Sequence, residues 1–227
     1  MGAVYHTDVV QGSDEWHAMR CGLLTASEMK LILTPTLKGA NNDKSRAHVY
    51  ELLAQRITKY VEPTYISDDM LRGQGDEFEA ANLYNQHFGP VQNCGFITNN
   101  KWGFTIGYSP DGLIGDDGLI ECKSRRQKYQ VQTLADGTVP LDYMLQIQTG
   151  LMVSEREWLD FISYSGGLPM AVMRCYQMDD VQEAIIAAAI AFESNLFEVE
   201  AAYRANLVSP NIRTVPTERK ITQEMFI

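Results

Sequence analysis

The sequence lacks the features of membrane-bound and secreted proteins. No run of its 227 residues approaches the ~18 apolar residues of a membrane span. The most apolar segment, AIIAAAIAF, is shorter and lies between Glu183 and Glu193. The N-terminal segment MGAVYHTDVVQGSDEWH has no basic region followed by an apolar one, so we expect no signal peptide. These absences predict a soluble protein of the cytoplasm.

Cysteine is scarce and widely spaced. The four cysteines, Cys21, Cys94, Cys122 and Cys175, form no CxxC pair and no Cys/His pattern typical of zinc or iron–sulfur sites. We therefore expect reduced, partly buried thiols rather than disulfides or a metal cluster. Internal repeats and low-complexity tracts are also absent from the sequence, which argues against a repeat architecture.

Basic residues are fewer than acidic ones. The chain has 19 Lys and Arg against 29 Asp and Glu, a formal net charge of −10. Proteins that bind nucleic acid over a broad surface usually have a basic excess, so the balance argues against that class. It does not exclude an enzyme that confines its basic residues to one channel and uses metal ions to offset the remaining charge of its substrate.

Periodicity and turn signals predict the order of the elements. Apolar residues at helical spacing predict helices over 12–20, 47–61, 75–89, 140–154 and 179–206, and a capping box over 25–28 predicts another helix start. Short β-branched or aromatic runs predict strands over 96–100, 102–115, 118–124, 157–165 and 170–178. This order favours an α/β fold in which helices flank a central mixed β-sheet. We expect one domain over 1–227, with an extended C-terminal tail over 208–227.

Two carboxylates and a lysine gather around one turn. In the strand GLIECKS, alternation places Glu121 and Lys123 on one face. The hairpin signal Gly115-Asp-Asp-Gly118 folds Asp111 back towards Glu121. Two close carboxylates repel unless a hard cation lies between them, and an adjacent lysine can hold a water or stabilise charge on a phosphate. A turn aspartate beside a solvated strand face is the alternative.

Five motifs extend the pattern across most of the chain: DEWHAMRCGLLTASE, GDEFEAANLY, SPDG, IECKS and YMLQIQ. In this order and spacing they resemble the phage lambda-type (YqaJ-like) exonucleases of the PD-(D/E)xK nuclease superfamily, from Trp16 to about Tyr176. The resemblance implies the restriction-endonuclease-like fold. It also implies 5′→3′ digestion of one strand of linear double-stranded DNA to mononucleotides, which leaves 3′ single-stranded overhangs.

The resemblance assigns the metal and catalytic residues. It implies that Asp111 and Glu121 bind catalytic Mg²⁺, with Mn²⁺ as a substitute, and that the main-chain carbonyl of Cys122 is a further oxygen donor. Lys123 is then the catalytic lysine that positions the attacking water.

A glutamine and a glutamate on two helices complete the implied site. Gln146 matches a glutamine that helps to orient the nucleophile, with Gln148 as the nearby competitor. Glu79 matches a helical glutamate near the metal, a second-metal or water-mediated ligand. Its neighbours Glu77 and Asp76 are equally acidic, and an exposed helix face is the alternative for all three.

Three residues correspond in the resemblance to a pocket for a 5′-terminal phosphate: Arg20, Ser27 and Ser109. The sequence by itself supports this assignment for Ser27 and Arg20. The capping box places Ser27 in the first turn of a helix, where free amides favour an anion, and Arg20 can add a bidentate guanidinium. An ordinary capped helix with a surface arginine is the alternative. We expect Trp16 and His17 to pack rather than to bind.

The resemblance also implies partners. It implies a homotrimeric ring around DNA, a single-strand annealing protein as recombination partner, and a phage or prophage source in the cytoplasm of a bacterial host. The segment Met70-Leu71-Arg72 is a candidate for a base-pair wedge. Candidates for phosphate contacts are Ser124, Arg125, Arg126 and Lys128, with a solvated loop as the alternative. Two other functions remain open: another endonuclease or helicase-associated nuclease of the superfamily, and a non-enzymatic partner protein on the same fold.

Overall fold

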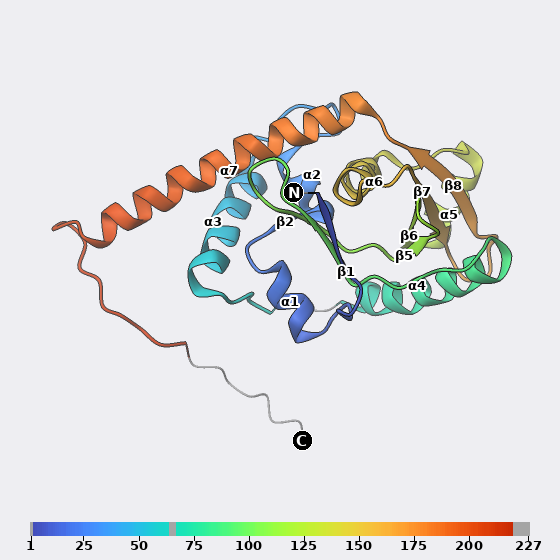
Figure 1. The fold of residues 1–227 in the computed structure, drawn as a ribbon, viewed down its shortest axis with the longest axis horizontal. Helices are drawn as coiled ribbons and strands as arrows, with labels where there is room; N and C mark the ends of the chain where they lie inside the picture. Colours follow the sequence, from blue (N-terminus) through green and yellow to red (C-terminus); the bar gives the residue numbers. More distant parts are fainter. Residues whose placement is uncertain (1, 64–66, 220–227) are drawn as a thin grey trace, which may run out of the picture.

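The computed structural model describes residues 2–63 and 67–219, whose strands form two four-stranded sheets surrounded by helices (Figure 1). The helices are α1 (Asp14–Arg20), the short 3₁₀ helix η1 (Ala26–Glu28), α2 (Met29–Ile32), α3 (Asp43–Thr58), α4 (Asp68–His87), α5 (Gln127–Asp136), α6 (Leu141–Ser154) and α7 (Asp179–Leu207). The strands are β1 (Ala3–His6), β2 (Leu24–Thr25), β3 (Phe96–Asn99), β4 (Ile106–Tyr108), β5 (Gly112–Ile114), β6 (Gly118–Ser124), β7 (Trp158–Tyr164) and β8 (Ala171–Tyr176).

Both sheets are mixed. The first has the order β1-β3-β4-β2 and the second β5-β6-β7-β8, and each contains one parallel pair, β2 with β4 and β6 with β7. The chain passes from the first sheet to the second between β4 and β5, at Pro110. Proline has no N–H to give to a ladder, so the segment predicted as one strand run over 102–115 divides here. The site described below lies at this crossing.

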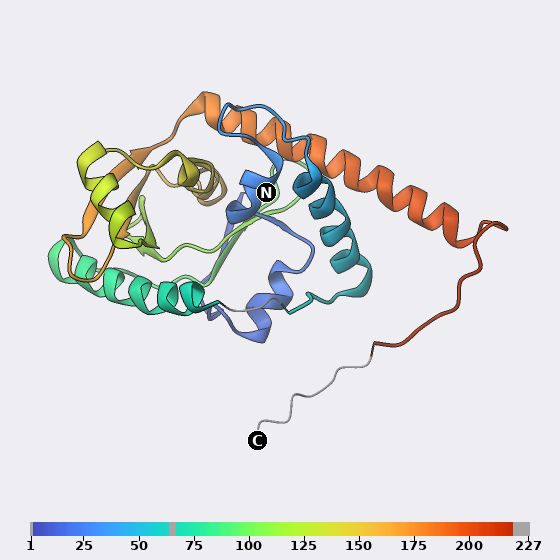
Figure 2. The ribbon, with the colours of Figure 1, turned by 180° about the vertical axis from the view of Figure 1, so that it is seen from behind.

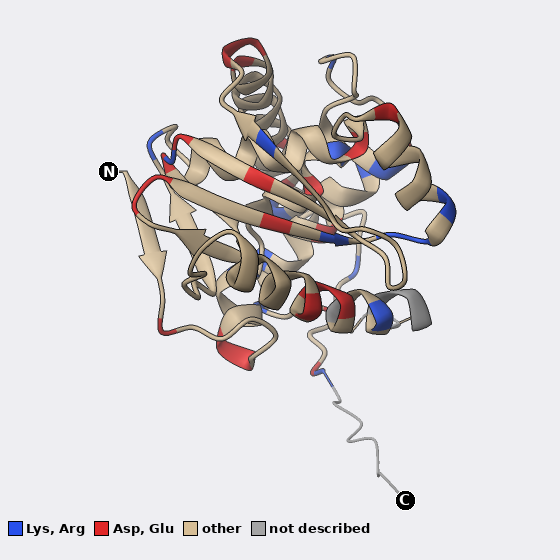
Figure 3. Cartoon of the chain, turned by 90° about the vertical axis from the view of Figure 1, so that its right-hand side faces the viewer, with Lys and Arg blue, Asp and Glu red and all other residues tan. Residues whose placement is uncertain are grey.

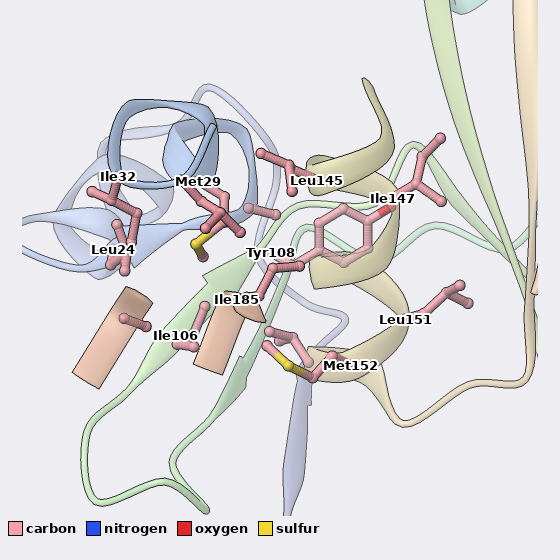
Figure 4. Packing of buried hydrophobic residues seen from close by; sticks show 14 of the residues in the cluster. Leu24, Met29, Ile32, Ile106, Tyr108, Leu145, Ile147, Leu151, Met152 and Ile185 are labelled. Atoms are coloured by element: carbon pink, nitrogen blue, oxygen red, sulfur yellow. The ribbon is translucent and has the colours of Figure 1, made fainter. Parts of the chain in front are cut away.

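Helix α6 packs against strands of both sheets, and this explains why so much of it is buried. Nine of its 14 residues are buried, among them Leu145, Ile147 and Leu151. Figure 4 shows Tyr108 of β4 pointing at this helix. The close approach requires Gly150, because a Cβ there would lie 2.7 Å from Cζ of the Tyr108 ring. Helix α6 therefore sets the spacing between the two sheets.

Helix α4 covers the other face of the second sheet. Its residues Ala80 and Tyr84 form a buried cluster with Ile120, Cys122 and Ile162. The cluster confirms the predicted alternation of β6, since the even-numbered residues of this strand face the core under α4. Glu121 and Lys123 consequently face the opposite side, towards α6.

Helix α7 is half packed and half projecting. Its first part buries one stripe at helical spacing that includes Val181, Ile185 and Leu196, and Glu193 forms an ion pair with Arg56 of α3 at 2.7 Å. Its C-terminal part extends beyond the body of the protein (Figures 1 and 2). Residues 208–219 form neither helix nor strand, and residues 220–227 of the expected tail lie outside the described residues.

The predicted mixed α/β fold with flanking helices is confirmed, with its strands shared between two sheets. Helix α4 begins at Asp68, earlier than the predicted 75, although Gly73 and Gly75 each cost a helix ~1 kcal/mol. Strand β1 and helix α5 were not predicted. All four cysteines are free thiols. None of the described helices is long and apolar enough to cross a membrane.

Candidate active site

The register of the second sheet brings Asp111 and Glu121 together. Gly112 of β5 pairs antiparallel with Ile120 of β6, so the residue before Gly112 lies beside the residue after Ile120. The Oδ2 atom of Asp111 accepts a hydrogen bond of 2.6 Å from the main-chain N–H of Cys122. This bond fixes the Asp111 carboxylate against the strand that carries Glu121.

Glu121 is 2% exposed and is held by three donors from three elements. The Tyr108 hydroxyl donates to its Oε2 at 2.9 Å, and Gln146 Nε2 donates to its Oε1 at 2.5 Å. Lys123 Nζ lies 2.6 Å from the same Oε1 atom. The structure thus assembles the predicted aspartate, glutamate, lysine and glutamine in one place.

Burial and mutual repulsion make this cluster electrostatically unusual. Burial, and then the neighbouring Glu121, raise the pKa of Asp111 well above its ordinary value. Burial alone lowers the pKa of Lys123, but Glu121 and Asp111 outweigh it, so this pKa lies above its ordinary value. Lys123 is therefore an ammonium ion at neutral pH. Ionising Asp111 in the folded protein therefore costs free energy, and a bound cation would lower that cost.

The donor set fits a hard divalent cation. Within the described residues, no three His, Cys, Asp or Glu side chains are grouped so that they could hold a metal ion. Mg²⁺ binds through one or two carboxylates and keeps several waters, and Asp111 with Glu121 supplies that number of carboxylates.

The structure separates Glu79 from its acidic neighbour Glu77 by their positions on α4. The Glu79 side chain is exposed on α4, whereas Glu77 is partly buried and lines the same cavity as Asp111. Residues two apart on a helix point in nearly opposite directions, so only one of the two can face the site. Burial, opposed by Lys123 and reinforced by Glu121, raises the pKa of Glu77. Figure 3 shows the acidic stretch of α4 beside the strands of the second sheet.

Asp76, the other acidic neighbour, has a different partner. Its Oδ2 atom accepts a hydrogen bond of 2.6 Å from the Ser124 hydroxyl and lies 3.7 Å from Arg72 Nε. These contacts tie α4 to the end of β6. Asp76 therefore holds the helix that carries Glu77.

The competition between the two glutamines of α6 is decided by their contacts. Gln148 is buried, donates to the Tyr176 carbonyl at 2.8 Å and accepts from the Met178 N–H at 2.9 Å. It therefore joins α6 to the chain after β8. Gln146 faces Glu121, so it is the glutamine of the site.

The three residues expected to hold a terminal phosphate lie together at the edge of the first sheet. Arg20 Nη1 donates to the Ser109 hydroxyl at 3.3 Å, and Nη2 donates to the Thr25 hydroxyl at 3.4 Å. Thr25 Oγ1 lies 3.3 Å from Ser27 Oγ. The predicted capping box is also present, with Glu28 accepting the Thr25 N–H at 2.9 Å. Thr25 therefore belongs to this cluster as well, although the sequence indicated it only as a helix cap.

Trp16 packs, as expected, and it packs against this cluster. Its ring centroid lies 4.4 Å from Cζ of Arg20, and its Nε1 donates to the Ser109 hydroxyl at 2.9 Å. The spacing of four residues between Trp16 and Arg20 on α1 was the signal that sequence reasoning missed. His17 is exposed. Burial, opposed by Glu28, lowers the pKa of Arg20, so its guanidinium is partly desolvated.

The further DNA-contact candidates have mixed outcomes. Arg125 Nη1 donates to the Tyr143 hydroxyl at 2.7 Å, and its guanidinium lies over the rings of Tyr129 and Tyr143, so it is packed rather than solvated. Lys128 lies over Tyr129. The Met70 side chain of the expected wedge lies outside the described residues, and Leu71 is exposed.

We expect Gly150→Ala to destabilise the protein by roughly 1–3 kcal/mol, because the new methyl group overpacks the buried Tyr108 ring, whose hydroxyl is fixed on Glu121. The matched control is Gly75→Ala in α4, where a Cβ meets nothing within 4 Å. That change should stabilise by up to ~1 kcal/mol. Urea unfolding measures both. If Gly150→Ala were more stable than wild type, the Tyr108 ring would be able to move away from the new methyl group, and the expected overpacking would be wrong.

Comparison with known proteins adds to this geometry. The model of the YqaJ-like viral recombinase domain matches residues 15–157. An alkaline exonuclease from Laribacter hongkongensis (LHK-Exo) is 27% identical with a TM-score of 0.71, over 85% of this chain and 99% of that chain. The structure of LHK-Exo in complex with dAMP is 28% identical with a TM-score of 0.72, again over 85% of this chain and 99% of that chain.

A phage-related exonuclease from Haemophilus somnus 129PT is 12% identical with a TM-score of 0.53, over 78% of this chain and 96% of that chain, and it supports the fold alone. No curated protein matches the chain. Together with the mixed sheets and flanking helices, these likenesses confirm the predicted fold class, the PD-(D/E)xK type.

Proposed function

Because the chain belongs to the family of the YqaJ-like viral recombinase domain, we propose that it is a Mg²⁺-dependent 5′→3′ exonuclease. It digests one strand of linear double-stranded DNA to mononucleotides and leaves 3′ single-stranded overhangs. The observation that carries the proposal is the position of Ser109, which belongs to the Arg20 cluster and lies two residues before Asp111. An anion site beside a hydrolytic site suits an enzyme that cuts at a fixed distance from a phosphorylated end.

The chain's own residues take distinct parts in the proposed reaction. Asp111 and Glu121 hold Mg²⁺, or Mn²⁺ in its place, together with the Cys122 carbonyl, and Glu77 adds negative charge on the same side. When bound, the metal polarises the phosphodiester and makes water a better nucleophile. Lys123, as an ammonium ion, positions the attacking water and offsets the charge that develops on the phosphate.

The remaining polar residues hold this arrangement in place. Gln146 donates to Glu121, which fixes the orientation of the carboxylate and places the glutamine amide next to Lys123. Tyr108 holds the other oxygen of Glu121 from inside the core. Arg20, Ser27 and Ser109 bind the 5′-terminal phosphate.

The decisive experiment compares linear duplex DNA, labelled on one strand, with a closed circle of the same sequence. Wild type is expected to release mononucleotides from the 5′ end of the linear duplex with Mg²⁺, to stop with EDTA, and to leave the circle intact. Cutting of the circle would favour an endonuclease of the same superfamily. No metal-dependent product on either substrate would favour a non-enzymatic partner protein.

Arg20→Ala is expected to lower the rate on 5′-phosphorylated ends by roughly 10–100-fold, the value of lost hydrogen bonds to a charged group. The rate on 5′-hydroxyl ends should change little, so the preference for phosphate disappears. Initial rates on the two ends measure this ratio. Arg204→Ala, which removes an exposed Arg–Glu pair on α7, is the matched control and should keep the preference. A preference that survives Arg20→Ala would refute the phosphate pocket.

The proposed assembly follows the family resemblance. We propose a single nuclease domain over 1–227 that forms a homotrimeric ring around DNA, in which an acidic exterior coexists with a basic inner channel. The proposed partner is a single-strand annealing protein, and the proposed setting is the cytoplasm of a bacterial host that carries the phage or prophage. Light scattering gives the mass of the assembly and tests the ring.

A further inference from the structure

A cavity of about 400 Å³ opens beside Asp111 and Glu77, and the proposed hydrolysis does not use it. One wall is α4, which contributes Phe78 and Ala81 next to Glu77. The loop after β1 forms another wall, which includes Val10. The volume lies in the range of small-molecule sites, so the cavity is large enough for one planar heterocycle.

The two walls expose apolar side chains that the fold does not need. Phe78 is 67% exposed and Val10 is 70% exposed. The buried face of α4 is formed by Ala80 and Tyr84, so Phe78 adds little to the core. A single exposed apolar residue is ordinary, but two that line the same cavity beside a catalytic aspartate suggest contact with a ligand.

The cavity touches both halves of the site. Asp111 and Pro110 line it from the hydrolytic side. Gly95 also lines it, and the Gly95 carbonyl accepts a hydrogen bond from Trp16 Nε1 at 3.2 Å. Trp16 is the residue on which Arg20 lies. The cavity therefore lies next to both the phosphate cluster and the carboxylate pair.

We propose that this cavity receives the nucleobase of the 5′-terminal nucleotide, an inference that rests on the proposed function. When the terminal phosphate is bound at Arg20 and the next phosphodiester at Asp111, the sugar between them is confined. Its base then enters the space that borders both sites. This space is the cavity between Phe78 and Val10.

The chemistry of the walls explains why every base is accepted. An aromatic side chain stacks on any nucleobase, since each has a π-face, and the apolar part of the lining reads no hydrogen-bond pattern. The lining also contains the polar residues Thr7, Gln11 and Asn93, of which Gln11 is engaged, with its Nε2 donating to the Pro110 carbonyl at 2.7 Å. A platform of this kind holds the nucleotide without selecting its sequence.

The test removes the base and its platform separately. Two 5′-phosphorylated duplexes carry an unpaired terminal nucleotide, one with a base and one with a tetrahydrofuran abasic residue, so that base-pair opening is the same. In single turnover, wild type should release the base-bearing nucleotide roughly 10-fold faster, as expected for one stacked base. Phe78→Ala should lose this advantage and hydrolyse both substrates at the slower rate.

The matched control is Phe197→Ala, which removes an equally exposed phenylalanine on α7, 72% exposed. It should keep the wild-type advantage. Equal rates on the two substrates for wild type, or an advantage that survives Phe78→Ala, would overturn the proposal.

A second readout does not depend on hydrolysis. A duplex with 2-aminopurine as the 5′-terminal base is bound by the Lys123→Ala protein, and its fluorescence should change as the base leaves the stack of the duplex and enters the cavity. Adding Phe78→Ala should abolish this change while binding persists. If no variant hydrolyses any duplex, the exonuclease proposal fails, and the fluorescence still decides the cavity. Unchanged fluorescence on binding, with hydrolysis intact in wild type, would overturn the cavity proposal alone.

Discussion

Lys123→Ala is expected to abolish hydrolysis, with a fall in kcat of roughly 10³-fold, while DNA ends still bind. The Lys123 side chain is 20% exposed, and its ammonium group lies 2.6 Å from Glu121 Oε1, so the change deprives that carboxylate of its ammonium partner. Single-turnover rates and a DNA-binding titration separate the loss of chemistry from any loss of affinity. The matched control is Lys101→Ala, which breaks a Lys–Glu pair of 3.0 Å elsewhere on the fold and should leave the rate unchanged.

Stability must be measured alongside, because the same change leaves Glu121 with less compensation. The pKa of Lys123 is raised in the folded state, so its stabilising contribution is complete below the unfolded pKa of about 10.4 and is lost as pH rises through the folded pKa. At pH 7 the alanine variant therefore loses all of it. Lys123→Arg keeps the charge but changes its shape, so it should retain stability and still lose most activity. If Lys123→Ala remained active, Lys123 would not be the catalytic lysine.

Asp111→Asn is expected to act in opposite directions on activity and stability. Activity should fall by at least roughly 10²-fold, because the amide removes one of the two carboxylates that we propose hold the metal. In metal-free buffer, however, the variant should be more stable by about 1–2 kcal/mol, which corresponds to a melting temperature higher by roughly 2–8 °C. The amide oxygen still accepts the Cys122 N–H, so the change removes the charge and keeps the bond.

The sign follows from the raised pKa of Asp111. A carboxyl group whose pKa is higher in the folded state stabilises the fold when protonated, and that contribution is lost as pH rises from the unfolded pKa through the folded one. The advantage of Asp111→Asn should therefore grow with pH and vanish in acid. Thermal unfolding across pH, without metal, measures it.

Metal addition provides the complementary test. Mg²⁺ at roughly 100 times its Kd should stabilise wild type by about 2.7 kcal/mol and the Asp111→Asn protein by much less. A melting temperature that Mg²⁺ leaves unchanged in wild type would contradict the metal assignment. Glu155→Gln, which changes a carboxylate outside the cluster, should leave the response to Mg²⁺ intact.

The centre of the site could be predicted from the sequence because strand geometry is regular. Alternation along β6 and the hairpin after Asp111 are local properties, and they suffice to bring Asp111, Glu121 and Lys123 together. Helices gave less certain answers. The choice between Gln146 and Gln148, and between Glu77 and Glu79, depends on the rotation of a helix, which packing against other elements decides.

The features that sequence reasoning missed are those that join distant segments. Trp16 meets Ser109 across 93 positions of the chain, and no local pattern indicates such a contact. The packing of α6 against strands of both sheets is likewise a contact between distant segments. The cavity beside Asp111 is formed by a loop and a helix that are adjacent only after folding.

The packing of α6 against both sheets has a consequence for the length of the product. Thr25 and Ser109 lie at the edge of the first sheet, while Glu121 and Lys123 belong to the second. In the proposed exonuclease reaction, the packing of Gly150 against Tyr108 inside the protein therefore helps to set the distance between the bound 5′ phosphate and the hydrolysed bond. A substitution that loosens this packing would then change the length of the product, for example to dinucleotides, or slow its release. Every residue proposed to contact the substrate would be unchanged.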